Sequence, residues 1–342
     1  MKVNFISGRN NLALTIMIPF DCPNNCPFCE SKKEYAKNRP HISEVINAIK
    51  HFFRDNNTLD VPEVVITGGE PMANMLVLKS IINVIPSDKD IYINTTLIKH
   101  NFDAFVNLVN NEPQIKGISV SRHYATYERD CKMLHGIVPD DYFDLITKPV
   151  RINCVVNSKT NIYEIMNRWE GRNVELSFRE NFNTMTAEEL HNPYSGYLLT
   201  LAAGLRYIGH TQCKVCDTTT FKSLGGLTVR YHKGVKNTLI RLAKNKYEIN
   251  DIIIRQDGKM FCDWDFTDIN LLPSTMFHDD TKDIMQKSRQ RMIDIASLSC
   301  TTCDSGGCGG GGVYNVRTCG SQAGCGDSYI RRHSLTCGGG GC

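Results

Sequence analysis

The segment that decides the fold reads Leu14-Thr-Ile-Met-Ile18-Pro-Phe-Asp-Cys22-Pro-Asn-Asn-Cys26-Pro-Phe28-Cys29. Its first five residues are apolar or β-branched, which is typical of a buried strand. Three cysteines follow directly within eight residues. Three thiolates in one tight loop suit an iron–sulfur cluster, and the missing fourth ligand leaves one iron open to a small molecule. A zinc site is the alternative, although structural zinc is closed by four protein ligands.

The strand pattern recurs along the chain to about residue 209, and amphipathic stretches separate the strands. Apolar residues share one helical face between Val45 and Phe53, and another between Ile162 and Trp169. Six strands alternating with helices predict an α/β fold whose parallel sheet is open or curled into part of a barrel. Ligands bind such sheets at the carboxyl ends of the strands. The six runs are Leu14–Ile18, Val64–Thr67, Ile91–Asn94, Gly117–Ser121, Val150–Val156 and Val174–Phe178.

A second motif, Val64-Val-Ile-Thr67-Gly68-Gly69-Glu70-Pro71, runs from the second strand into a turn. The glycines allow a ligand to approach the backbone closely, and the Glu70 carboxylate can accept hydrogen bonds from an ammonium group. Alone, the motif is equally compatible with a plain tight turn. Because it follows the cysteine loop by one strand–helix unit, both motifs belong at the same end of the sheet.

The CX3CXφC loop, with aromatic Phe28, and the following GGEP together resemble the radical S-adenosylmethionine (SAM) superfamily. The resemblance implies a partial (β/α)6 TIM-like barrel with a [4Fe–4S] cluster on Cys22, Cys26 and Cys29. It also implies that the open iron binds SAM, and that reduction cleaves SAM to a 5′-deoxyadenosyl radical, which abstracts a hydrogen atom from a substrate. The residues implied to contact SAM in these motifs are Phe28, Gly68, Gly69, Glu70 and Pro71.

The resemblance continues along the later strands. The segment Tyr92-Ile-Asn94-Thr95-Thr96 is similar to the family's third strand, although the usual Thr-Asn-Gly is absent. The fourth and fifth strands imply two further SAM contacts, Ser121 and Asn153, against the alternative of satisfied polar groups at strand ends. The segment Val174-Glu-Leu-Ser-Phe178-Arg179 resembles the sixth strand. We expect His123 at the surface, and we expect Cys131 and Cys154 to be ordinary thiols.

A third group of cysteines consists of Cys213-Lys-Val-Cys216 and, after a long insert, Asp257-Gly-Lys-Met-Phe-Cys262. It resembles the MoaA-like branch, in which such cysteines bind a second cluster in a C-terminal extension of the twitch type. The insert is much longer here than in that branch. Zinc remains an alternative, because CX2C with distant cysteines serves zinc equally well.

A fourth group, Cys300-Thr-Thr-Cys303-Asp-Ser-Gly-Gly-Cys308, is similar to part of the SPASM extension of peptide-modifying radical SAM enzymes. It departs from that pattern in its four-residue gap and in lacking a cysteine shortly after the glycines. The resemblance therefore implies one or two auxiliary [4Fe–4S] clusters. Residues 300–342 hold seven cysteines and few large apolar side chains, so they cannot fold by packing alone. This tail is a candidate cluster ligand, a redox relay, a fused substrate or a flexible segment.

These groups divide the chain into a radical SAM core at 1–210, a twitch/SPASM-like auxiliary-cluster domain at 211–299, and a Cys/Gly-rich tail at 300–342. The middle region still reads as globular, with a strand at Ile252–Arg255 and a helix at Asp283–Ala296. The expected fold class is thus an α/β partial (β/α)6 TIM-like barrel with a small C-terminal iron–sulfur extension.

The composition excludes several other classes. A net charge of +3 over 342 residues gives no strong nucleic-acid or membrane-surface signal. No run of 18 apolar residues predicts a membrane span, and Met1–Phe20 lacks the apolar core of a signal peptide. The 15 cysteines therefore indicate metal ligands in a cytoplasmic protein more than disulfides in a secreted one.

The expected function is a radical SAM enzyme acting on a peptide or protein. Its reductant, by family resemblance, is a flavodoxin or ferredoxin. One alternative is a MoaA-like enzyme that cyclises a nucleotide. Two others are a non-catalytic iron–sulfur electron-transfer protein, against which the GGEP turn argues, and a zinc-binding interaction module.

Overall fold

The fold is taken from a computed structural model. It describes residues 4–7, 13–19, 22–24, 26–29, 31–32, 37, 39–55, 61, 63–156, 160–180, 204–212, 215–234, 240–243, 246–264, 266 and 271–272. The expected helix Asp283–Ala296, the tail 300–342 and four expected ligands therefore lie outside the described residues. Those ligands are Cys213, Cys300, Cys303 and Cys308.

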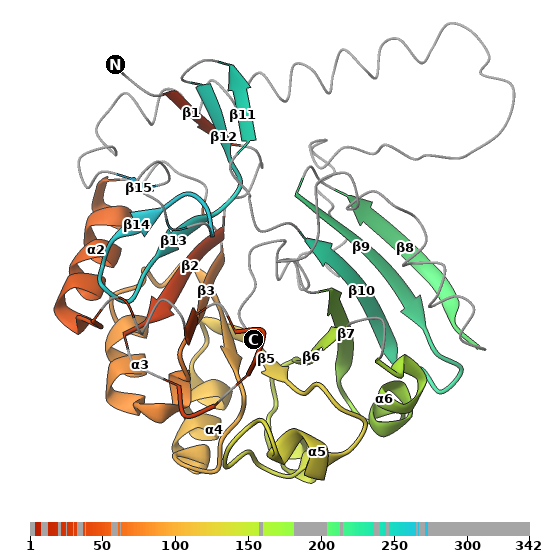
Figure 1. Cartoon of the computed structure of the whole chain (residues 1–342). Coiled ribbons are helices and arrows are strands. Elements are labelled where there is room, and N and C mark those ends of the chain that lie inside the picture. The colour runs from red at the N-terminus through yellow and green to blue at the C-terminus, as the bar shows by residue number, and fades with distance from the viewer. Residues whose placement is uncertain are drawn as a thin grey trace, which may run out of the picture.

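Six parallel strands form the centre of the molecule and lie side by side in chain order, as the sequence predicted. Each strand is hydrogen-bonded in parallel to the next, and helices connect them (Figure 1). The fold class is therefore confirmed as a mostly parallel α/β sheet of the partial TIM-barrel type. The strands are β2 (Ala13–Ile18), β3 (Glu63–Gly68), β4 (Asp90–Thr95), β5 (Ile115–Ser121), β6 (Val150–Val156) and β7 (Glu175–Glu180).

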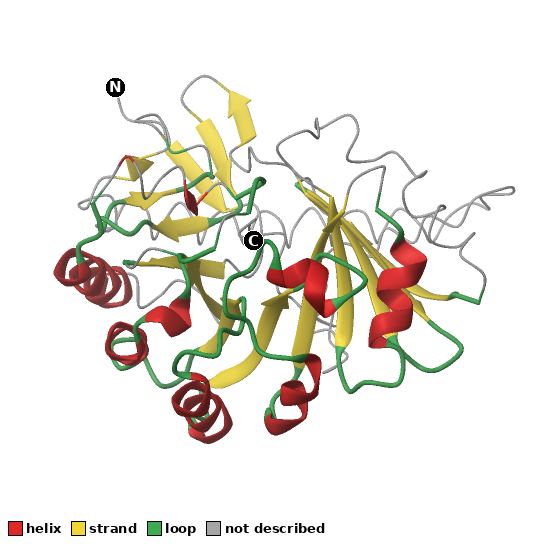
Figure 2. Ribbon diagram, turned by 60° about the horizontal axis from the view of Figure 1, so that its bottom comes forward, coloured by secondary structure: helices red, strands yellow, loops and turns green. Residues whose placement is uncertain are grey.

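The connecting helices lie along one side of the curved sheet (Figure 2). Their amphipathic faces explain the arrangement: in α2 (Ile42–Asp55), Val45, Ile49 and Phe52 recur at helical spacing and are buried in the core. Burying each of these side chains stabilises the folded state by roughly 1.5–3 kcal/mol relative to leaving it exposed. The other connections are η1 (Pro71–Ala73), α3 (Met75–Ile82), α4 (Phe102–Asn111), α5 (Tyr127–Cys131), η2 (Asp140–Leu145) and α6 (Ile162–Trp169).

Further strands extend the sheet on both sides to twelve. Beyond β7 lie parallel β10 (Thr228–Gly234) and then antiparallel β9 (Cys216–Lys222) and β8 (Arg206–Gln212). Beyond β2 lie parallel β13 (Ile252–Ile254) and then antiparallel β14 (Met260–Phe261) and β15 (Leu271–Leu272). The sheet thus continues across the predicted boundary at residue 210.

A separate sheet of three strands has the order β1 (Asn4–Ser7), β12 (Lys246–Ile249) and β11 (Ile240–Ala243). The sequence patterns did not indicate these strands. Among the described residues, no helix is long and apolar enough to cross a membrane.

Alternate residues of each strand point to opposite faces of the main sheet. One face packs on the helices and is apolar, with core residues such as Leu14, Ile66, Val120 and Leu176. We call the opposite face the inner face. From β4 to β10 it carries mostly polar residues, among them Asn94, Ser119, Ser121, Arg151, Asn153, Glu175, Ser177 and Arg230.

Candidate cofactor site

One cavity brings the first two motifs together at the carboxyl ends of β2, β3 and β4. It lies where the loop after β2, the turn after β3 and the end of β4 meet. The sequence placed the cysteine loop and the GGEP turn at one sheet end, and the structure bears out that placement. The cavity is lined by Cys22, Asn24, Cys26, Cys29, Lys32, Gly68, Gly69, Glu70, Asn94, Thr95 and Thr96.

The three cysteines of the loop are not in disulfides, and each is partly or fully buried. Burial is the main cause that raises the pKa of Cys22 and of Cys26 to about 12, and the neighbouring Cys29 acts in the same direction. As thiolates they therefore require compensating positive charge, which iron supplies. Three soft sulfur donors with an open fourth position fit a [4Fe–4S] cluster that also binds a small molecule. Within the described part of the chain, no three His, Cys, Asp or Glu side chains group tightly around a single ion.

The turn after β3 depends on glycine. Gly68 has φ of 106°, a left-handed conformation that residues with a Cβ rarely adopt. Pro71 begins η1, and the Glu70 carboxylate caps it by accepting a hydrogen bond from the Met72 backbone N–H at 3.1 Å. The GGEP sequence therefore encodes both the sharp turn and the helical start that follows it.

Glu70 ties this turn to the end of β4. Its Oε1 accepts from the Thr95 hydroxyl at 2.5 Å, and its Oε2 accepts from the Thr96 backbone N–H at 2.7 Å and the Thr96 hydroxyl at 2.6 Å. With Met72, these donors fill the four acceptor positions of a carboxylate that is only 1% exposed. The sequence assigned Glu70 to the cofactor; the structure adds that Glu70 positions the strand ends around the cavity.

Asn24 is a cavity residue that sequence reasoning missed. It is 3% exposed, and its Nδ2 donates to Thr96 Oγ1 at 2.9 Å, while its Oδ1 accepts from the His135 backbone N–H at 2.7 Å. Asn24 therefore joins the cysteine loop to β4 and to the connection before β6. The available signal was a polar residue with both a donor and an acceptor between two cysteines.

His123 lies under the cysteine loop, so the expectation of a surface position was wrong. Its side chain is 4% exposed, and its ring meets Phe28 edge-on with centroids 4.8 Å apart. Nδ1 accepts the Val155 backbone N–H at 3.1 Å, which puts the proton of the neutral ring on Nε2. Burial, followed by the Arg122 charge, lowers the pKa of His123 to about 3.

Ser121 and Asn153 occupy neighbouring positions on the inner face, because β5 and β6 pair them in register. Both are buried, and within the described residues the Asn153 Oδ1 has no hydrogen-bond partner. They do not line the cavity at β2–β4, but they continue its edge of the sheet toward β7. An unpartnered buried acceptor at this position is compatible with the expected ligand contact.

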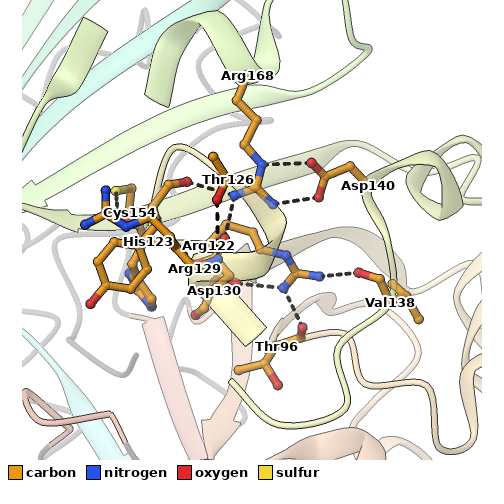
Figure 3. Close-up of polar contacts among 12 residues, drawn as sticks. Thr96, Arg122, His123, Thr126, Arg129, Asp130, Val138, Asp140, Cys154 and Arg168 are labelled. Carbon is orange, nitrogen blue, oxygen red and sulfur yellow. Dashed lines mark hydrogen bonds and ion pairs between the residues drawn. The ribbon is translucent and has the colours of Figure 1, made fainter. Parts of the chain in front are cut away.

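A buried charge network fixes the chain between β5 and β6 next to the site (Figure 3). Arg122 is fully buried and donates to the carbonyl oxygens of Thr96 at 2.6 Å and Val138 at 3.1 Å. Arg168 of α6 pairs with Asp130 at 2.5 Å and with Asp140 at 2.8 Å. Breaking such a buried pair leaves an uncompensated charge, so the network holds this connection firmly against the end of β4. Cys154, expected as an ordinary thiol, is buried beside it.

Of the third cysteine group, the two described members, Cys216 and Cys262, lie toward opposite edges of the sheet. Cys216 begins β9 opposite Gly234, the last residue of β10, and so lies at the carboxyl edge of the parallel strands. Cys262 follows β14, which runs antiparallel to β13, and so lies toward the amino edge. Cys262 is buried in the apolar core, which raises its pKa to about 12. Cys216 is disulfide-bonded, so ligation of metal by Cys216 requires reduction first.

The fold is similar to several solved structures. Streptococcus suis SuiB bound to S-adenosylmethionine matches with a TM-score of 0.52 and 15% identity, over 82% of this chain and 64% of SuiB. A histidine-tagged form of anSMEcpe with bound AdoMet matches with a TM-score of 0.50 and 12% identity, over 81% of this chain and 83% of anSMEcpe. The chain thus spans just under two thirds of the length of SuiB. No protein-family model and no curated protein matches the sequence.

Proposed function

We propose that this chain is a radical SAM enzyme whose substrate is a peptide or protein. The observation that carries the proposal is the cavity lined jointly by Cys22, Cys26, Cys29, the Gly68–Glu70 turn and the end of β4. An electron-transfer protein needs the cysteines but has no need of the turn. The fold similarity to structures that contain S-adenosylmethionine supports the same conclusion.

In this proposal each part of the cavity has a separate task. The three thiols would hold a [4Fe–4S] cluster and, because the cavity supplies no fourth thiol, would leave room there for SAM. Gly68 and Gly69 let the methionine end approach the backbone, and Glu70 fixes the turn. When bound, the cluster and SAM would supply the radical chemistry that removes a hydrogen atom from the substrate. The protein excludes water and positions the substrate.

Ser121 and Asn153 are proposed as further SAM contacts. They are buried neighbours on the inner face, one and two strands beyond β4. The unpartnered Asn153 Oδ1 offers an acceptor to the ribose hydroxyls or the ammonium group. The Phe28 backbone is proposed to contact the adenine, with the ring held by His123.

The C-terminal cysteines are proposed to bind at least one auxiliary cluster. Cys216 lies at the same sheet edge as the cavity, whereas Cys262 lies toward the opposite edge. This separation favours a site that combines Cys213 and Cys216 with Cys300, Cys303 and Cys308 of the SPASM-like group over a MoaA-like trio with Cys262. Because SPASM-like cysteines are typical of peptide-modifying enzymes, the same observation favours a peptide over a nucleotide.

The test is anaerobic reconstitution followed by counting iron and sulfide per chain. We compare the wild type with a Cys22/Cys26/Cys29→Ala triple variant and with Cys131→Ala, which removes a thiol that does not line the cavity. Dithionite serves as the reductant in place of the flavodoxin or ferredoxin. The quantity measured is the 5′-deoxyadenosine that forms when SAM is added. We expect the triple variant to lose about four irons and all deoxyadenosine, and Cys131→Ala to lose neither. Zinc in place of iron, or no deoxyadenosine from the loaded wild type, would contradict the proposal.

A further inference from the structure

Three charged residues meet on the inner face of β6, β7 and β10, away from the cysteine cavity. Arg151 of β6 and Glu175 of β7 are register partners, and Arg230 lies on β10, which pairs with β7. All three point away from the helices, because their strand neighbours Ile152, Leu176 and Val229 are in the core. We call these three residues the arginine cluster.

Glu175 links the two guanidinium groups. Its Oε2 accepts from Arg151 Nη2 at 3.1 Å and Nε at 3.3 Å, and from Arg230 Nε at 3.4 Å. The side chains of Arg151, Glu175 and Arg230 are 6%, 19% and 18% exposed. Among the described residues, two cations thus contact this one carboxylate, at a place where water screens charge poorly.

Arg230 still has free donors. Its Nε is the atom that contacts Glu175, and its two terminal nitrogens contact no group in the part of the chain that the structure describes. A guanidinium presents these nitrogens as a planar fork that matches the two oxygens of a carboxylate. The Glu175 contact holds the fork in place, so little side-chain entropy is lost when it binds an anion.

Arg230 lies level with the proposed SAM contacts, whereas Arg151 and Glu175 lie one layer nearer the amino ends of the strands, in register with Ser119. The register runs from Ser121 to Asn153, Ser177 and Arg230 across four neighbouring strands. Because strands lie about 4.8 Å apart, the backbones of Asn153 and Arg230 are roughly 10 Å apart along this layer. A group held by Arg230 therefore leaves the rest of its molecule within reach of the cofactor site.

We propose that the arginine cluster binds a carboxylate of the substrate, either an acidic side chain or the C-terminal carboxylate of a peptide. The inference rests on the proposed function for the identity of the substrate, but not for the binding of the anion. Glu175 already contributes one carboxylate, and its repulsion disfavours a phosphate dianion.

The test is ligand-observed NMR on the full-length, reconstituted protein with four probes. N-acetylglutamate methylamide carries a side-chain carboxylate, and N-acetyl-alanyl-alanine carries a C-terminal one. N-acetylglutamine methylamide is the neutral isostere, and inorganic phosphate is the competing anion. We expect one or both carboxylates to bind and the neutral isostere not to bind. The carboxylate that binds identifies the source.

Variants separate specific binding from general charge. Arg230→Ala should weaken carboxylate binding at least tenfold, and Arg230→Lys, which keeps the charge but loses the fork, should weaken it less. Arg241→Ala, which removes an arginine of the separate sheet, is the matched control and should bind as the wild type does. Equal binding by the wild type and Arg230→Ala, equal binding of the neutral isostere, or a preference for phosphate would overturn the inference.

A second measurement separates this inference from the proposed function. Deoxyadenosine formation with dithionite and SAM, without substrate, should be the same in Arg230→Ala and the wild type. If the wild type forms no deoxyadenosine, the proposed function is wrong, but the carboxylate binding measured by NMR is unaffected. Normal deoxyadenosine with unchanged probe binding in Arg230→Ala sinks only the carboxylate site.

Discussion

The two halves of the main sheet carry opposite kinds of site. At β2–β4 the site consists of three thiols, two glycines and Glu70, and its anion is held entirely by neutral donors. At β6, β7 and β10 the site consists of charged side chains, and its anion, Glu175, is held by two guanidiniums. The first half is suited to a metal cofactor that brings its own charge, whereas the second presents the Arg230 guanidinium that we propose binds a carboxylate.

The halves also differ in how the chain encodes them. The first half is formed by two short contiguous segments of the sequence, each directly after a strand. The second brings together Arg151, Glu175 and Arg230, whose positions span 80 residues and meet only through strand register. A cofactor site that depends on loop geometry is thus local in sequence, while a site on the face of a sheet is not.

Glu70→Gln is expected to have the largest effect, because it removes the buried charge of the first half. The amide keeps one acceptor oxygen, but its NH2 group faces hydrogen-bond donors of Thr95 or Thr96. At least one buried hydrogen bond is therefore lost. We expect a loss of about 3 kcal/mol in the free energy of unfolding. Deoxyadenosine formation should fall more than tenfold, measured with dithionite and SAM. If Glu70→Gln keeps the wild-type free energy of unfolding and the wild-type rate of deoxyadenosine formation, Glu70 does not hold the strand ends.

Glu175→Gln is the matched change in the second half and should do less. Glu175 is partly exposed, so removing its charge should cost about 2 kcal/mol of stability, measured by urea unfolding. The amide also removes the carboxylate that Arg151 and Arg230 share, so phosphate should compete better with N-acetylglutamate methylamide than in the wild type. Iron content and deoxyadenosine should not change. A loss of iron in Glu175→Gln would show that the two halves are not separate.

Sequence reasoning recovered the six parallel strands, and the cysteine loop and GGEP turn at one end of them, because each strand is a local run and each motif directly follows one. It missed β8 and β9, which are rich in polar residues and pair with each other and, through β9, with β10. It placed His123 at the surface because a histidine after a strand carries no local sign of burial. The position is set by Phe28, 95 residues away, and by the β6 backbone. Likewise, the distance between Cys216 and Cys262 follows from strand direction, which spacing does not reveal.

Asn24→Ala tests whether the first half is held together from within the cysteine loop. It removes the hydrogen bonds to Thr96 and from the His135 backbone, which should cost about 1.5 kcal/mol. We expect faster loss of iron to a chelator, by roughly tenfold if the whole cost falls on the loaded loop. Asn110→Ala, which breaks contacts to Leu145 and Thr147 away from the cavity, is the control and should keep its iron. If iron is lost at equal rates from Asn24→Ala and Asn110→Ala, the effect of Asn24 is one on overall protein stability and not on the cysteine loop.

His123→Gln should have the smallest effect, and it tests the boundary between the halves, where β5 ends. The pKa of His123 is lowered to about 3, so the ring stays neutral when folded but takes up a proton in the unfolded chain below about 6.5. Its contribution to stability is therefore complete above pH 6.5 and is lost as the pH falls from 6.5 toward 3. At pH 5.5 that loss is about 1.4 kcal/mol relative to pH 7.5. Urea unfolding of the wild type and of His123→Gln at both pH values isolates this contribution, because other titrating groups cancel between the two proteins. The same pH dependence in both would mean that His123 is protonated in the folded state, and hence that the cysteine loop does not seal this end of the site from water.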